Sequence, residues 1–295
     1  MIINVSKSGN LCNQLIQMIH ISAIAIESNQ KIVHVFLGDL GDTIDFSKGK
    51  KYGIYVPGGI ARKRVWSKAR VKIEQQLVRN DYTRYAKESI KNAPAAEQKM
   101  LQRRLYINNS WYIRDYQLVQ KHRAVLSNVI APYASVLEKV RKNFNIYRGQ
   151  NENTVLVGVH MRRGDYRTWQ NGEFYFSDEQ WNNLFLQMCE FPQFSNKHLK
   201  FIAFSNEEIN RRKFSERLDI VISQGSVGED LSALSLCDFI MGPPSTFSWI
   251  ANYIGKNKYY VVYNPERKIT YHDFSNEIQP EVTSYNIKKL KEEHS

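Results

Sequence analysis

The segment from residue 160 to 166 combines residue types that are suited to binding an anion. It holds His160, the adjacent arginines Arg162 and Arg163, and Asp165. A guanidinium group is planar and donates two parallel hydrogen bonds to phosphate oxygens. Neighbouring arginines are also common as solvated surface charges, and here they would then pair with Asp165. The segment therefore indicates either a phosphate site or a solvated charge pair.

An apolar run leads directly into these polar residues. Residues 155–160 are rich in β-branched side chains, which is typical of a buried parallel strand. Ligands of open α/β sheets bind beyond the carboxyl ends of the strands. The strand would therefore carry both arginines to the edge of a sheet where ligands bind.

A second candidate anion site lies at residues 242–248. Ser245, Thr246 and Ser248 stand at the start of a helix predicted over 246–254. The free N–H groups and the dipole of a helix N-terminus attract anions, although the hydroxyls could equally serve only as N-caps. If this turn and the two arginines share one edge of a sheet, they could hold a diphosphate between them.

The C-terminal half alternates between strands and helices. Strands are predicted at 155–160, 200–204, 220–223, 238–241 and 258–263, and helices at 178–190, 229–236 and 246–254, the first opening with a Ser177–Gln180 capping box. This alternation predicts a parallel, doubly wound sheet with right-handed crossovers.

The N-terminal half begins as a βαβ unit without a phosphate-loop motif. A strand at 2–5, a turn at 9–14, a helix at 15–27 and a strand at 31–37 follow one another, and Gly-Lys-Ser/Thr and GxGxxG are both missing. Further on, basic helices are predicted at 61–80 and 84–92, and helices at 115–130 and 133–144 are broken at Pro132. The polar segment 147–153 is the predicted linker, which gives two domains, 1–150 and 151–295.

The positive charge is concentrated in the N-terminal half. Residues 1–150 hold 25 Lys and Arg against 10 Asp and Glu, whereas residues 151–295 hold 16 against 19. The densest run, over residues 62–72, fits a solvated helix face, an anionic membrane surface or nucleic acid. No nucleic-acid recognition motif accompanies it, so nucleic acid is not an expected partner.

The lack of a membrane span and of a signal peptide, together with the cysteine pattern, predicts a cytoplasmic protein that contacts the inner face of the membrane only peripherally. No apolar segment has the length of a membrane span, and the N-terminus lacks the pattern of a signal peptide. The three cysteines are far apart, form no metal-ligand pattern and suggest a reducing compartment.

Several segments together resemble the α-1,2-fucosyltransferases of glycosyltransferase family 11. Residues 160–166 resemble the family's HxRRxDY motif, and residues 244–249 resemble its NSSFSWW segment. Weaker matches occur at residues 9–17, 204–207 and 230–238, in the family's order. Asn10 and Cys12 stand where the family has glycines, and Asp238 stands where it has histidine.

The resemblance implies a fold and a set of roles. The fold is α/β of the GT-B type, with two Rossmann-like domains facing across a cleft, and the last helix is expected to pack back on the N-terminal domain. The implied reaction is inverting transfer of fucose from GDP-fucose to a hydroxyl of a glycan acceptor, expected to be galactose O2 of an oligosaccharide or lipid-linked glycan. The implied donor contacts are guanine for His160 and Asp230, diphosphate for Arg162, Arg163, Ser245, Thr246 and Ser248, and fucose or phosphate for Asn13.

The chemistry is expected to need no metal and no cofactor other than the donor. The chain contains no Asp-x-Asp, so Arg162 and Arg163 would themselves stabilise the negative charge that develops on the departing phosphate. Asp165 completes the predicted catalytic set. Beside two guanidinium groups its carboxylate suits an orienting partner better than a base, and the departing phosphate can accept the proton instead.

Two other functions fit the same sequence. One is transfer of another sugar, such as mannose, from its GDP-sugar. The pocket residues near the sugar decide between such donors, and the sequence does not identify them. The other is noncatalytic binding of nucleic acid or anionic lipid by the basic half.

Overall fold

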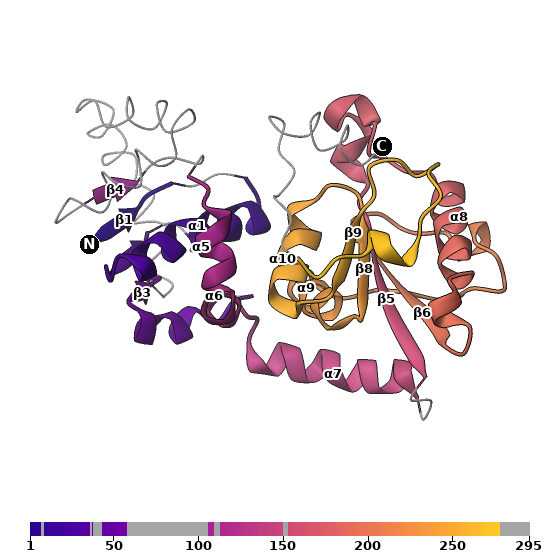
Figure 1. Cartoon of the computed structure of the whole chain (residues 1–295), viewed down its shortest axis with the longest axis horizontal. Helices are drawn as coiled ribbons and strands as arrows, with labels where there is room; N and C mark the ends of the chain where they lie inside the picture. The colour runs from indigo at the N-terminus through magenta and orange to yellow at the C-terminus, as the bar shows by residue number, and fades with distance from the viewer. Residues whose placement is uncertain are drawn as a thin grey trace. The chain divides into compact units, whose positions relative to one another are not determined.

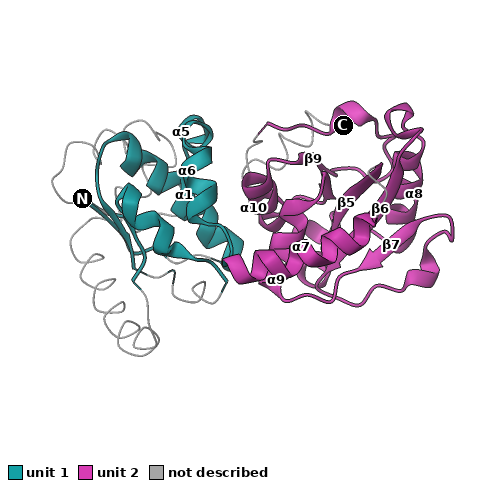
Figure 2. Ribbon diagram, turned by 90° about the horizontal axis from the view of Figure 1, so that it is seen from below, with its two compact units in different colours: residues 1–133 teal, residues 134–295 magenta. Residues whose placement is uncertain are grey.

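The computed structural model describes residues 1–6, 9–35, 37, 43–57, 106–108, 113–149 and 153–277. The chain divides into two compact units, Met1–Tyr133 and Ala134–Ser295 (Figures 1 and 2). The predicted basic helices at 61–80 and 84–92 and any helix near the C-terminus lie outside the described residues.

The first unit contains a four-stranded parallel sheet in the order β3-β2-β1-β4. Its elements are β1 (Ile2–Asn4), α1 (Leu11–Glu27), β2 (Ile32–His34), η2 (Phe46–Tyr52), β3 (Ile54–Tyr55), β4 (Tyr106–Asn108), α5 (Tyr116–Lys121) and α6 (Arg123–Val129). The predicted βαβ opening is confirmed. The helix predicted over 115–130 is two helices, because the chain turns at His122.

A buried polar row crosses the carboxyl ends of three strands in the first unit. His34, Asn4 and Asn108 are in register on β2, β1 and β4. The amide of Asn108 donates to Asn4 Oδ1 at 2.8 Å, and Asn4 Nδ2 lies 3.0 Å from His34 Nδ1. Ser22 Oγ completes the row, 2.9 Å from His34 Nε2. Burial lowers the pKa of His34 to about 3, so the row is neutral.

The second unit contains a five-stranded parallel sheet in the order β7-β6-β5-β8-β9. Its helices and strands are α7 (Ala134–Arg148), β5 (Thr154–Met161), α8 (Asp178–Cys189), β6 (His198–Ser205), β7 (Asp219–Ile222), α9 (Val227–Leu236), β8 (Phe239–Gly242), α10 (Thr246–Gly255) and β9 (Lys258–Val261). The short 3-10 turns are η3 (Gly164–Arg167), η4 (Trp169–Gly172), η5 (Pro192–Phe194), η6 (Arg211–Lys213) and η7 (Tyr271–Asp273). The predicted doubly wound arrangement is confirmed.

Helices cover both faces of this sheet, with α9 and α10 on the side opposite α8 (Figure 1). Strand β5 is therefore buried along almost its whole length, which explains its continuous apolar sequence. The capping box predicted for α8 is present: Gln180 N donates to Ser177 Oγ at 3.2 Å, and Ser177 N to Gln180 Oε1 at 2.9 Å.

Helix α7 belongs to the second unit, whereas the sequence places the domain boundary at residue 150. The buried side chains of α7, Val140 and Phe144, are apolar, and the helix packs on α9. The division between the units therefore falls between Tyr133 and Ala134. The polar segment 147–153 connects the end of α7 to β5 inside the second unit.

The strand order places a topological switch point between β5 and β8. From β5 the chain proceeds to β6 and β7 on one side, and then to β8 and β9 on the other. In doubly wound sheets, ligands bind at the carboxyl edge where the order reverses. Both candidate anion sites, the end of β5 and the start of α10, lie at this point.

Candidate active site

The two arginines that follow β5 have different surroundings. The Arg162 side chain is 26% exposed and its Nη2 lies 2.7 Å from Asp165 Oδ1, while Asp165 itself is 59% exposed. The Arg163 side chain is 9% exposed, and its Nη2 is bonded to the Asp178 carboxylate. Its Nε has no hydrogen-bond partner among the residues that the structure describes. Arg162 is therefore the arginine that remains open to a ligand, and Arg163 is held within the fold.

The turn that carries the arginines is fixed by the end of the neighbouring strand β6. Asn206 Oδ1 accepts a hydrogen bond from Arg163 N at 2.9 Å, and Glu207 Oε1 accepts one from Gly164 N at 3.0 Å. Gly164 has a φ of +61°, and a Cβ atom there would lie 2.5 Å from Asn206 Nδ2. Glycine is thus required for this turn to approach β6.

Contacts across the switch point join β5 to the start of α10. His160 Nδ1 lies 2.8 Å from Ser248 Oγ, and both residues are buried. The Tyr166 hydroxyl donates to the carbonyl of Pro244, just before the N-cap of the helix. Burial, with a smaller contribution from Arg162, lowers the pKa of His160 to about 3. His160 is therefore a neutral hydrogen-bonding group at this edge of the sheet.

The N-terminus of α10 is the second polar wall of the switch point. Ser245 is its N-cap, and its hydroxyl accepts a hydrogen bond from Phe247 N at 3.2 Å. Ser245 and Thr246 are partly exposed, whereas Ser248 is completely buried. The first two hydroxyls are therefore accessible to a ligand, and the third is occupied by His160.

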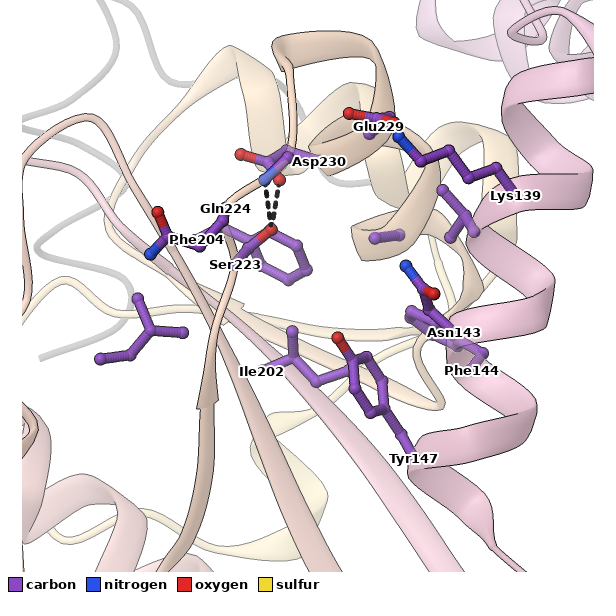
Figure 3. A pocket seen from close by; sticks show the side chains of 14 residues that line it. Lys139, Asn143, Phe144, Tyr147, Ile202, Phe204, Ser223, Gln224, Glu229 and Asp230 are labelled. Carbon is purple, nitrogen blue, oxygen red and sulfur yellow. Dashed lines mark hydrogen bonds and ion pairs between the residues drawn. The ribbon is translucent and has the colours of Figure 1, made fainter.

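A pocket of about 260 Å³ lies between α7, α9, one face of β6 and the end of β7 (Figure 3). Its floor is apolar and includes Ile202, Phe204 and Ile222, and its other lining side chains include Asn143, Tyr147 and Gln224. Asp230, near the start of α9, supplies a carboxylate to the lining.

Among the described residues, no cation engages the Asp230 carboxylate of this pocket. The neighbouring Glu229 is paired with Lys139 of α7 and also caps α9 through Ser226 N at 2.8 Å. One Asp230 oxygen, Oδ1, accepts a hydrogen bond from Ser223 Oγ at 2.5 Å. Burial raises the pKa of Asp230 to about 6, although the bond from Ser223 opposes the shift. Asp230 therefore titrates close to neutral pH.

The structure groups the predicted site residues in two places. His160, Arg162, Arg163, Asp165, Ser245, Thr246 and Ser248 gather at the switch point, and Asp230 lines the pocket between α7, α9 and β6. His160 does not line that pocket, so the two residues predicted to contact guanine are not brought together there. Asn13 lies in the first turn of α1, in the first unit.

Three residues of the site had no predicted role. Asp178, the partner of Arg163, is 15 positions along the chain and resembles an ordinary acidic residue of a helix first turn. Glu207 lies in a segment that resembles a family motif, but nothing in that motif shows that it fixes the turn. Ser223 directly follows β7 and bonds to Asp230. The one sequence signal for its role is that it is a polar residue at the carboxyl end of a strand.

Two features are absent from the described residues. Outside the gaps in the described ranges, no helix has both the length and the apolar character to cross a membrane. Over the same residues, no three His, Cys, Asp or Glu side chains are grouped as a metal site.

The two units, each with a parallel sheet and flanking helices, define an α/β protein of the GT-B type, as the sequence predicts. The profile of Glycosyl transferase family 11 matches residues 100–279, which is more than half of the chain. The chain therefore belongs to glycosyltransferase family 11. No match was found among curated proteins.

Solved structures of fucosyltransferases share the fold. A variant of Arabidopsis thaliana FUT1 in complex with GDP is 12% identical, with coverage of 95% of this chain and 74% of that one and a TM-score of 0.56. POFUT1 in complex with GDP-fucose is 11% identical, with coverage of 87% and 94% and a TM-score of 0.54. NodZ, an α-1,6-fucosyltransferase soaked with GDP-fucose, is 12% identical, with coverage of 90% and 97% and a TM-score of 0.50.

Proposed function

We propose that this protein transfers fucose from GDP-fucose to a glycan hydroxyl, O2 of a terminal galactose, with inversion and without a metal. The observation that carries the proposal is that Arg162 and the N-terminus of α10 flank the switch point of the sheet. Membership of glycosyltransferase family 11 supports the choice of donor, as do the complex of POFUT1 with GDP-fucose and the GDP-fucose soak of NodZ, two fucosyltransferases that share the fold.

The donor would lie along the carboxyl edge of the second sheet. The diphosphate would accept hydrogen bonds from Arg162, the hydroxyls of Ser245 and Thr246, and the first N–H groups of α10. Neighbouring strands are about 4.8 Å apart, so the end of β7 is about 10 Å from the end of β5. A nucleoside diphosphate spans that distance, so its guanine would reach the pocket and present N1–H and N2–H to Asp230.

Transfer breaks the bond between fucose C1 and the β-phosphate oxygen as the galactose O2 bonds to C1 from the opposite face. The negative charge that develops on the β-phosphate is stabilised by the fixed donors of Arg162 and α10. The galactose hydroxyl lies on the face of fucose opposite the phosphate, so its proton passes to solvent water, and the departing phosphate takes up a proton from solvent. Asp165, 2.7 Å from Arg162, orients the guanidinium. Arg163 stabilises the turn that carries Arg162, because its buried guanidinium is bonded to Asp178.

The test is a product assay with GDP-fucose and N-acetyllactosamine, with the linkage assigned by NMR. We expect an α-1,2-linked fucose on galactose. A product only from another GDP-sugar, such as GDP-mannose, would replace the donor while leaving the nucleotide assignment intact. Thermal stabilisation by GDP but not UDP is the matching binding result. Stabilisation only by an oligonucleotide, with a steep dependence on salt, would identify a noncatalytic binder instead.

A further inference from the structure

The segment after Arg163 contains an unusual backbone turn close to the switch point. Gln170, Asn171 and Gly172 have φ values of 50°, 58° and 79°, three consecutive left-handed residues within η4. Residues other than glycine adopt left-handed conformations uncommonly, and such conformations are concentrated at functional sites. The turn is well defined, since Asn171 N bonds to Thr168 O at 3.1 Å and Tyr175 N to Gly172 O at 3.0 Å.

This turn holds Trp169 at the outer end of a stack of aromatic rings. The Trp169 ring lies 4.7 Å from Tyr166 and 5.5 Å from Phe174, centroid to centroid. Tyr166 and Phe174 are buried, whereas Trp169 is partly exposed. Arg162 lies over the Tyr166 ring at 5.6 Å. One buried ring therefore separates Trp169 from the guanidinium assigned to the leaving phosphate.

The side chains next to Trp169 are neutral amides. Within the described part of the chain, Gln170 and Asn171 form no side-chain hydrogen bond, and both retain solvent exposure. An amide both donates and accepts hydrogen bonds, as a sugar hydroxyl does. Partly exposed aromatic surface beside such amides can therefore contact both the apolar face and the hydroxyls of a sugar.

We propose that Trp169, Gln170 and Asn171 form the acceptor subsite, in which the terminal pyranose of the glycan places its C–H face on the indole. The two amides bind hydroxyls at the edge of that sugar. The subsite rests on the proposed function, because its place beside Arg162 matters only if Arg162 binds the donor phosphate. It concerns the acceptor alone and predicts no contact with GDP.

The test compares Trp169→Ala and Trp169→Phe in the full-length enzyme. We expect Trp169→Ala to raise the KM for N-acetyllactosamine by about tenfold or more, Trp169→Phe to have a smaller effect, and the Kd for GDP to stay within about twofold of wild type for both. The matched control is Tyr175→Ala, because Tyr175 is a partly exposed aromatic of the same segment that lies under Arg167 and outside the stack. The control should keep the wild-type acceptor KM.

A binding measurement separates this inference from the proposed function. N-acetyllactosamine is titrated into the enzyme–GDP complex while the indole Nε1–H signal of Trp169, assigned from the Trp169→Phe variant, is followed by NMR. A shifted signal without any transfer product would support the subsite and reject the reaction. Transfer with an unchanged acceptor KM in folded Trp169→Ala would support the reaction and overturn the subsite. Equal losses of GDP and acceptor affinity would also overturn it, as would the absence of any shift.

Discussion

The Arg163 guanidinium is bonded to the Asp178 carboxylate, and Arg163 is 7% exposed. Removal of one partner of a buried ion pair leaves the other charge unpaired, which typically costs 3–5 kcal/mol. Asp178 is 21% exposed, so for Asp178→Ala we expect the lower end, a loss of about 3 kcal/mol in the free energy of unfolding. Urea unfolding measures the loss.

The matched control for that change is Asp165→Ala at the other arginine. The Arg162–Asp165 pair is more exposed, and exposed pairs contribute less than about 1 kcal/mol. We therefore expect Asp165→Ala to unfold almost as wild type does. Equal losses for the two variants would show that the two arginines do not differ as described.

The exchange of Arg162 for lysine tests its proposed role at the departing phosphate. Lysine keeps the charge but loses the planar, two-pronged donor. If Arg162 bonds to the phosphate as charge develops, Arg162→Lys should lower both kcat and kcat/KM by on the order of 10²-fold. Arg163→Lys is expected to act mainly through stability and the position of the turn. A folded Arg162→Lys enzyme with wild-type kcat would refute the role.

GDP affinity should depend on pH through Asp230. Burial raises the pKa of the Asp230 carboxyl to about 6, so the group is ionised at pH 7.5 and protonated at pH 5. The ionised form accepts hydrogen bonds from guanine, so GDP affinity should fall as pH falls through about 6. Asp230→Asn should remove this dependence and weaken binding at pH 7.5 by roughly 10–100-fold, because hydrogen bonds to charged groups contribute about 1.5–3 kcal/mol. Calorimetry over pH 5–8 measures both effects.

The stability of the ligand-free protein should depend on Asp230 in the opposite sense to GDP affinity, because it should rise as pH falls. The folded carboxyl has a pKa above its ordinary value of 3.8, so the folded state binds the proton more readily than the unfolded chain. The contribution of Asp230 to stability therefore rises as pH falls through about 6.

Ser223→Ala removes a bond that opposes the shift in the Asp230 pKa, so it should move the pH midpoint of GDP binding to higher pH. An unchanged midpoint would mean that Ser223 does not support the carboxylate.

Turnover should persist in EDTA. The chain has no Asp-x-Asp, and the proposed donors to the phosphate are Arg162 and the start of α10. The initial rate with GDP-fucose is measured before and after dialysis against EDTA. A loss of activity that Mn²⁺ or Mg²⁺ restores would contradict a metal-free mechanism.

We also propose a cytoplasmic location with peripheral attraction to the inner face of the membrane, where a lipid-linked acceptor would lie. The basis is the excess of Lys and Arg in residues 1–150. Each basic residue near an anionic surface contributes about 1 kcal/mol, and salt screens that attraction. Sedimentation with anionic liposomes should be strong at low salt and weak at high salt. Equal binding to neutral liposomes would oppose the proposal.

The sequence determined the C-terminal architecture because its signals there are local and agree with one another. Apolar runs predicted the five strands of the second sheet, and the Ser177–Gln180 pair predicted the start of α8. The order of polar strand ends also predicted that the arginines and the start of α10 would share one edge. These inferences hold because parallel strands place their carboxyl ends together.

Only the tertiary structure decided which arginine is accessible to a ligand and which carboxylate has a raised pKa. Arg162 and Arg163 are adjacent and identical in type, and they differ because the chain brings Asp178 from α8 to one of them. Asp230 and Glu229 are also adjacent, but Lys139 from α7 engages Glu229 and lowers its pKa, whereas burial raises the pKa of Asp230. Solvent exposure and partners from distant segments set these differences, and no local pattern records them.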